Sequence, residues 1–134
     1  MPFLDEIADR LAAQGVGTVG SSIFKGSKAV IPTGDGPYLS LTETGGTMPT
    51  RIMNESRGHT QRPTAQILAR AKNYSTARAM CKAAYDALDG VFNTALNGTI
   101  YQRIVARQEP TDLGLDENGR VMIVFNIEVE KTPS

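Results

Sequence analysis

The side chains with most capacity for covalent chemistry in this chain are its single cysteine and its single histidine, Cys81 and His59. A thiol that lies beside an imidazole can act as the nucleophile of a hydrolase. Cys81, however, falls on a stripe of apolar side chains spaced three and four residues apart, which predicts a buried place on a helix. A single cysteine excludes an intramolecular disulfide, and with one distant histidine it supplies too few ligands for zinc. These features argue against catalysis, and a small hydrolase that uses Cys81 and His59 is kept only as an alternative.

Two other segments come close to ligand-binding motifs but lack residues that the chemistry requires. In residues 20–28, GSSIFKGSK, a lysine precedes the second glycine and no helix follows, whereas a phosphate-binding loop needs Gly-Lys-Ser/Thr before a helix. Residues 112–123 lack the alternating carboxylates and terminal glutamate of a calcium loop, so they predict a solvated turn. Glu128 and Glu130 share one face of a strand and are interpreted as solvated. We therefore predict no catalytic residue, no metal site, no cofactor and no enzyme activity.

Charge is balanced over the whole chain but not along it. The formal net charge is zero, which argues against a protein that coats nucleic acid or an anionic membrane. Residues 51–72 contain five basic residues and one acid, a sum of +4, and residues 109–130 contain one basic residue and six acids, a sum of −5. Such segments pair within one molecule, pair between copies, or reflect ordinary surface scatter. A head-to-tail contact between copies closes into a ring where the rotation allows, and unlike charges would set its register.

The candidate residues for contact with other proteins come from these two segments. They are Arg51, Arg57, His59, Arg62, Arg70, Glu109, Asp112, Asp116 and Glu117. Binding of nucleic acid through residues 51–72 is a further alternative, although the chain offers no aromatic platform for single strands.

Two helices are predicted to position these segments. From Pro2 to Gln14, apolar residues recur three and four apart, and two acids stand in the first turn, where the helix dipole favours them. The second helix starts at Ser75, which suits an N-cap, and Gly90 ends it. Its apolar stripe consists of Ala77, Met80, Cys81, Ala84, Tyr85 and Leu88. Small residues on one face of the strand at residues 64–71 would let this helix approach closely.

The remaining sequence predicts a sheet and one long loop. Strands are expected at residues 22–31 (broken near Gly26), 38–44, 64–71, 99–107 and 120–131. Residues 91–96 are assigned to no element, and residues 109–119 form a connection. Residues 45–62 form a long polar loop, and such loops usually carry function or reach a partner. Because helices and strands do not alternate regularly, we predict an α+β fold, with an antiparallel or mixed β-sheet and two α-helices packed on one face, as a single domain over residues 1–134. Without a signal peptide or a run of ~18 apolar residues, a soluble intracellular chain is expected.

A series of short motifs follows in order over residues 38–131. They are Gly45-Gly46 followed by Pro49, Arg62-Pro63 at the start of a strand, Arg70 in the strand before a helix, Tyr74 at the start of that helix, Leu88-Asp89-Gly90 at its end, and Pro110 before a turn that contains Leu113, Asp116, Gly119 and Arg120. The last strand then contains Asn126. In this order the motifs resemble the tail-terminator and minor capsid (head–tail joining) proteins of long-tailed bacteriophages.

The resemblance implies a function by assembly. It implies a small α+β subunit of a homo-oligomeric ring, hexameric by the resemblance. Such a ring caps the head-proximal end of the tail tube and stops its polymerisation. The implied partners are other copies, the tail tube protein and the head–tail connector or stopper protein, with DNA passing through the lumen without specific binding and no membrane involved. The implied location is the virion neck, after assembly in the host cytoplasm. A head-completion or stopper protein is the nearest alternative.

Overall fold

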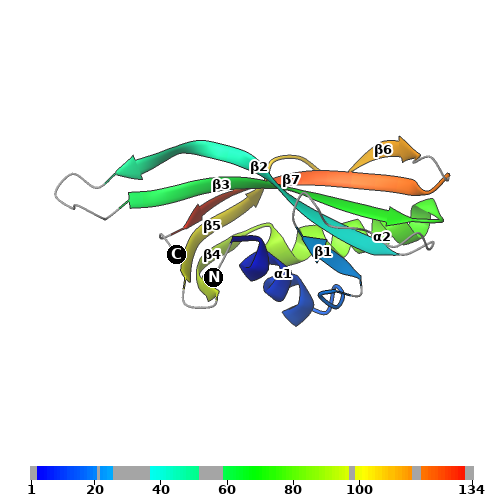
Figure 1. The fold of residues 1–134 in the computed structure, drawn as a ribbon, viewed down its shortest axis with the longest axis horizontal. Helices are drawn as coiled ribbons and strands as arrows, with labels where there is room; N and C mark the ends of the chain where they lie inside the picture. Colours follow the sequence, from blue (N-terminus) through cyan, green and yellow to red (C-terminus); the bar gives the residue numbers. More distant parts are fainter. Residues whose placement is uncertain are drawn as a thin grey trace.

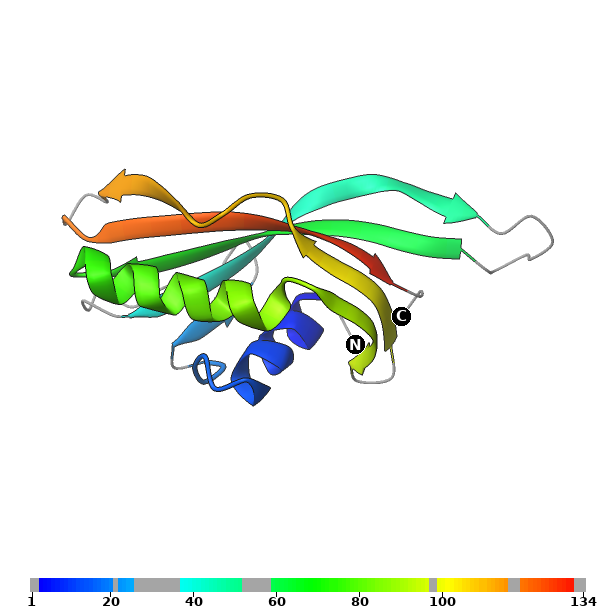
Figure 2. The ribbon, with the colours of Figure 1, turned by 180° about the vertical axis from the view of Figure 1, so that it is seen from behind.

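The computed structural model describes residues 3–20, 22–25, 37–51, 59–96, 99–115 and 119–131, with the backbone alone at residues 46–51 and 59–61. Its elements in chain order are α1 (Phe3–Ala13), β1 (Ile23–Lys25), β2 (Tyr38–Arg51), β3 (His59–Ala71), α2 (Tyr74–Leu88), β4 (Val91–Leu96), β5 (Thr99–Ala106), β6 (Thr111–Leu115) and β7 (Val121–Lys131). One mixed sheet contains these strands, and both helices lie on the same face of it (Figures 1 and 2). The predicted α+β fold is confirmed.

The sheet is organised around its two central strands, β3 and β7. The strand order is β1-β2-β3-β7-β5-β4, and of the described strand pairs only β1 with β2 is parallel. β5 and β6 share the second edge of β7, since β5 pairs with its residues 127–131 and β6 with its residues 121–124. β4 and β6 are thereby edge strands near opposite ends of β7.

Every second side chain along the two central strands faces the helices. These side chains form one apolar layer between the sheet and the helices. The buried ladder pairs of β3 and β7 are Ala65 with Ile127, Ile67 with Phe125 and Ala69 with Ile123. The small alanines on β3 leave room for α2, whose Cys81, Ala84 and Leu88 have no exposed surface. Burial of one Leu, Ile or Phe side chain contributes roughly 1.5–3 kcal/mol, so this layer is the main source of stability.

A buried polar cluster ties α1 to the sheet. The Tyr101 hydroxyl on β5 donates a hydrogen bond of 2.8 Å to Oε1 of Glu6, and both side chains are fully buried. Burial raises the pKa of Tyr101, and the hydrogen bond to Glu6 raises it further. Lys131, only 2% exposed, has its pKa lowered by burial, and the charge of Glu6 opposes that shift. The acids of the first turn thus have separate roles, because Asp5 forms an ion pair with Lys25 of β1.

The prediction of a long loop over residues 45–62 is wrong. β2 and β3 form a hairpin that stays paired as far as Arg51 and His59. Register shifts between Glu43 and Gly45 and between Thr47 and Thr50 interrupt the two-residue period of β2. With that period broken, the polar sequence loses the alternation by which a strand is recognised.

Three further assignments differ from the sequence prediction, and one lies partly outside the described residues. Residues 91–96, assigned to no element, form the strand β4. Residues 109–119 contain the strand β6, and the five residues of β6 are all exposed, so no apolar alternation marks it. Ser75 is not the N-cap, because α2 begins after Asn73, whose backbone is extended and whose side chain makes no capping hydrogen bond. Of the predicted strand at residues 22–31, β1 covers Ile23–Lys25, and residues 26–31 lie outside the described residues. Gly90 follows α2 with φ of 81°, as its place at the helix end requires.

Candidate protein-contact surfaces

No active site that uses Cys81 or His59 is seen among the described residues. Cys81 lies on the buried side of α2, where burial raises its pKa to about 12, a shift that the nearby Arg78 partly opposes. His59 begins β3, and its side chain lies outside the described part of the chain. Among the described residues, no three His, Cys, Asp or Glu side chains cluster as a metal site would require. No helix of the described chain is long and apolar enough to span a membrane.

The buried thiol leads to a direct prediction about reactivity. At pH 8 the native protein should incorporate almost no iodoacetamide, because a thiol with a pKa of about 12 is nearly all protonated and the helix covers it. An Ala79→Cys variant places a second thiol on the exposed side of the same helix and should take up one equivalent rapidly. Mass spectrometry of the intact chain, with and without urea, measures both. Fast native modification of Cys81 would contradict the packing described here.

The hairpin of β2 and β3 extends beyond the rest of the sheet. β1 accompanies β2 only at residues 39–41, and the pairing of β3 with β7 ends at Gln61 and Lys131. Past these points β2 and β3 continue together and project from the body of the molecule (Figures 1 and 2). We refer to residues 45–51 and 59–64 as the β2–β3 arm, whose base still pairs with β7 at Gln61 and Thr64. Its end carries two predicted contact residues, Arg51 and His59, as a backbone pair, whereas the predicted contact residue Arg57 lies outside the described residues.

Arg62, at the base of the arm, belongs to a charge cluster within the subunit. Oε1 of Glu130 lies 3.7 Å from Arg62 and 3.2 Å from Arg103. Because β3 and β5 flank β7, one residue of the predicted basic segment pairs here with one residue of the predicted acidic segment. For Arg62, the interpretation that the two oppositely charged segments pair within one molecule is therefore correct. Partly exposed pairs of this kind contribute about 0–1 kcal/mol each, so the cluster adds little to the stability of the subunit.

The other predicted contact residues are dispersed. Arg70 lies on the sheet face opposite the helices, with its guanidinium 5.6 Å from the centre of the Tyr38 ring. Glu109 and Asp112 are exposed before and within β6, and Asp112 accepts a hydrogen bond of 2.8 Å from the backbone N–H of Gly114. Asp116 and Glu117 lie outside the described residues. The described charges therefore do not gather into one site.

Among the described residues, five large apolar side chains are exposed, and the sequence analysis did not identify them. On the β4–β5 hairpin, Phe92 is 60% and Ile100 is 50% exposed. At the other end of β7, Tyr74 at the start of α2 is 51% exposed, and Leu113 and Leu115 of β6 are 53% and 65% exposed. The signal available in the sequence was a pair of leucines, Leu113 and Leu115, inside an otherwise polar segment.

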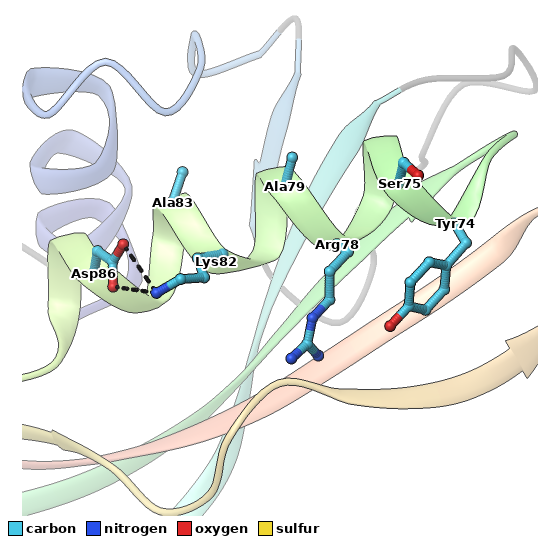
Figure 3. A pocket seen from close by; sticks show the side chains of 7 residues that line it. All are labelled: Tyr74, Ser75, Arg78, Ala79, Lys82, Ala83 and Asp86. Carbon is cyan, nitrogen blue, oxygen red and sulfur yellow. Dashed lines mark hydrogen bonds and ion pairs between the residues drawn. The ribbon is translucent and has the colours of Figure 1, made fainter.

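A shallow hollow runs along the outer side of α2. It is lined by Tyr74, Ser75, Arg78, Ala79, Lys82, Ala83 and Asp86. Figure 3 shows Tyr74 and Arg78 pointing to the same side of the helix, and Arg78 donates a hydrogen bond of 2.5 Å to the carbonyl of Pro110. Lys82 and Asp86 bond to each other at 3.2 Å. Its charged side chains Arg78, Lys82 and Asp86 are therefore all engaged within the subunit.

Comparisons with known proteins relate the chain to one family and to a solved structure. The family model described as bacteriophage tail terminator protein matches residues 10–133. Among solved structures, the chain is similar to a chain from the virion of a native gene transfer agent (GTA) particle, with 17% sequence identity and a TM-score of 0.57. That likeness covers 96% of this chain and 94% of the other and shows a shared fold. No curated protein matches the chain.

Proposed function

Because the chain belongs to the bacteriophage tail terminator protein family, whose model matches residues 10–133, we propose that it forms a closed ring that caps the tail tube of a phage. The chain is a structural protein of the phage tail or neck. In this proposal the ring contains identical subunits, six by resemblance, and lies at the head-proximal end of the tube. There it stops polymerisation of the tube and joins the tail to the head connector. We propose no enzymatic activity for it.

The proposed partners follow from this position. They are further copies of the chain, the tail tube protein and the connector or stopper protein of the head. DNA passes through the lumen without specific binding, and the formal net charge of zero supports a subunit that does not hold nucleic acid tightly. Assembly takes place in the host cytoplasm, and the finished ring is part of the virion.

The family match carries the proposal, and the shape of the subunit supports it. The β2–β3 arm projects past the core, and a projecting hairpin of this kind can reach a neighbour or the tube below (Figure 1). Edge strands at opposite ends of β7 leave two separate surfaces for adjacent subunits. These features suit a protein that works through contacts with other proteins.

The function is tested in a phage that lacks this gene product. We expect tails of uncontrolled and abnormal length in electron micrographs, with normal length restored by the protein supplied in trans. Filled heads that leak DNA, accompanied by tails of normal length, would instead indicate a stopper protein. Native mass spectrometry of the purified wild-type chain, alone and with tail tubes, should show one closed oligomer. A chain that stays monomeric under both conditions would contradict the ring.

A further inference from the structure

Three polar side chains from α1, β5 and β7 are buried together inside the subunit. Glu6 and Tyr101 have no exposed surface, and Lys131 is 2% exposed. The Tyr101 hydroxyl donates a hydrogen bond of 2.8 Å to Oε1 of Glu6, whereas the buried Oε2 accepts no hydrogen bond from the described residues. Burial lowers the pKa of Lys131 and the charge of Glu6 raises it, so the ammonium and the carboxylate interact. We refer to Glu6, Tyr101 and Lys131 as the polar cluster.

The polar cluster is a poor source of stability. Removing a carboxylate and an ammonium from water costs free energy that their mutual attraction often does not offset. Apolar side chains of similar volume at such sites frequently give a protein that is equally stable or more stable. Oε2 of Glu6 adds to the cost, because a buried acceptor without a donor has lost its hydrogen bonds to water. The presence of these groups in an otherwise apolar layer therefore requires a reason other than stability.

The polar cluster lies where the β2–β3 arm leaves the core. Lys131 on β7 is the ladder partner of Gln61 on one side and of Tyr101 on the other. The pair of Gln61 with Lys131 is the last described pair between β3 and β7 before the arm continues alone. The hydrogen bond from Tyr101 to Glu6 brings α1 to the same place. One buried cluster therefore joins α1, β5 and β7 at the base of the arm.

A slip of strand register is the error that the polar cluster opposes. The β5–β7 ladder contains a register shift between Tyr101 and Arg103, directly beside the cluster. Because side chains alternate between the two faces of a sheet, a slip by one residue would turn Tyr101 or Lys131 to the opposite face. Glu6 would then stay buried without its donor or its cation, which costs much more than exchanging one apolar contact for another.

We propose that Glu6, Tyr101 and Lys131 form a lock that fixes the register of β5 and β7 at the base of the β2–β3 arm, and with it the position of the arm on the core. The lock specifies one arrangement and adds little to overall stability. The inference concerns the single subunit and does not rest on the ring. For an arm that contacts another protein, a fixed position reduces the conformational entropy that is lost on binding.

The test compares variants of the full chain in dilute solution. Lys131→Met removes the cation and leaves Glu6 buried. The triple variant Glu6→Leu/Tyr101→Phe/Lys131→Met replaces the whole polar cluster by apolar side chains of similar size. The control Lys82→Gln/Asp86→Asn removes an ion pair of 3.2 Å on the exposed side of α2. Urea-induced unfolding measures stability, and hydrogen exchange measures the opening of each segment separately.

The lock predicts opposite changes in stability and in local order. Lys131→Met should lower the urea midpoint by about 1 M or more, because Glu6 loses its cation. The triple variant should unfold at the wild-type midpoint or above it. Its amides in α1 and in the β2–β3 arm should nevertheless exchange about tenfold faster or more, while those of residues 65–69 keep their wild-type rates. The control should match the wild type in both measurements.

Two results for the triple variant would overturn the lock. Lower stability with faster exchange in every segment would show that the polar cluster serves stability. Wild-type stability with wild-type exchange in α1 and the arm would show that the register is fixed without the cluster. Tyr101→Phe removes only a hydroxyl and supplies the test if the larger changes prevent folding. It should raise exchange in the same two segments, and unchanged rates there would contradict the proposal.

Discussion

The Phe125→Ala variant is expected to lose about 3–5 kcal/mol of unfolding free energy, which is a large part of the 5–15 kcal/mol typical of a domain. Phe125 has no exposed surface, pairs across the ladder with Ile67, and meets the Tyr85 ring edge to face at 5.7 Å. It therefore joins the centre of the sheet to α2. Alanine would leave a cavity that these neighbours cannot fill without moving the helix.

The measurement is urea-induced unfolding of dilute protein, under conditions in which the wild type is monomeric. Phe92→Ala is the matched control, because the same substitution at a side chain that is 60% exposed should change the unfolding free energy by less than about 1 kcal/mol. Comparison of the two variants therefore separates the effect of losing a buried phenylalanine from the effect of losing an exposed one. Equal losses for both variants would contradict the burial of Phe125, and so would a loss below about 1 kcal/mol for Phe125→Ala.

The elements predicted best from the sequence are those with one buried face. In the second half of β7, Phe125, Ile127 and Val129 alternate with Asn126, Glu128 and Glu130 because only one face meets the helices. In α2 the apolar stripe through Cys81 and Leu88 follows the helical period for the same reason. Burial on one side imposes a period on the sequence, and that period is what makes the element recognisable.

The parts that were not predicted lack such a period. β6 is exposed at each residue, and the arm strand β2 contains two register shifts, so neither segment shows regular alternation. The Arg62–Glu130 contact depends on β3 lying next to β7, and strand order follows from the packing of the whole chain rather than from local sequence. Phe92 and Ile100 could be taken for core residues from their type alone, and only the fold places them outside. Exposed apolar positions and contacts between distant strands are therefore harder to predict from this sequence than its core.

A ring with a shortened β2–β3 arm should assemble but bind tail tubes at least about 100-fold more weakly than the wild type, if the arm carries the contact with the tube. The variant replaces residues 51–59 by Asn-Gly, a two-residue turn that closes a hairpin on the pair Thr50 and Thr60. It removes Arg51, Arg57 and His59 together, and it keeps the pairing of Gln61 with Lys131 that ends the β3–β7 ladder. The subunit should stay folded because no described core residue lies in the removed segment.

Binding is measured by sedimentation of purified rings with preformed tubes, and ring formation by native mass spectrometry of the same samples. A second variant that replaces residues 51–59 by glycine and serine of equal length tests whether side chains or length matter. If side chains such as Arg51 provide the affinity, both variants should lose tube binding, because neither retains a charged group at the end of the arm. Recovery of binding by the glycine–serine variant alone would assign the arm a role as a spacer. Wild-type binding by the shortened ring would show that the tube is held elsewhere on the subunit, and loss of the ring itself would place the arm between neighbouring subunits instead.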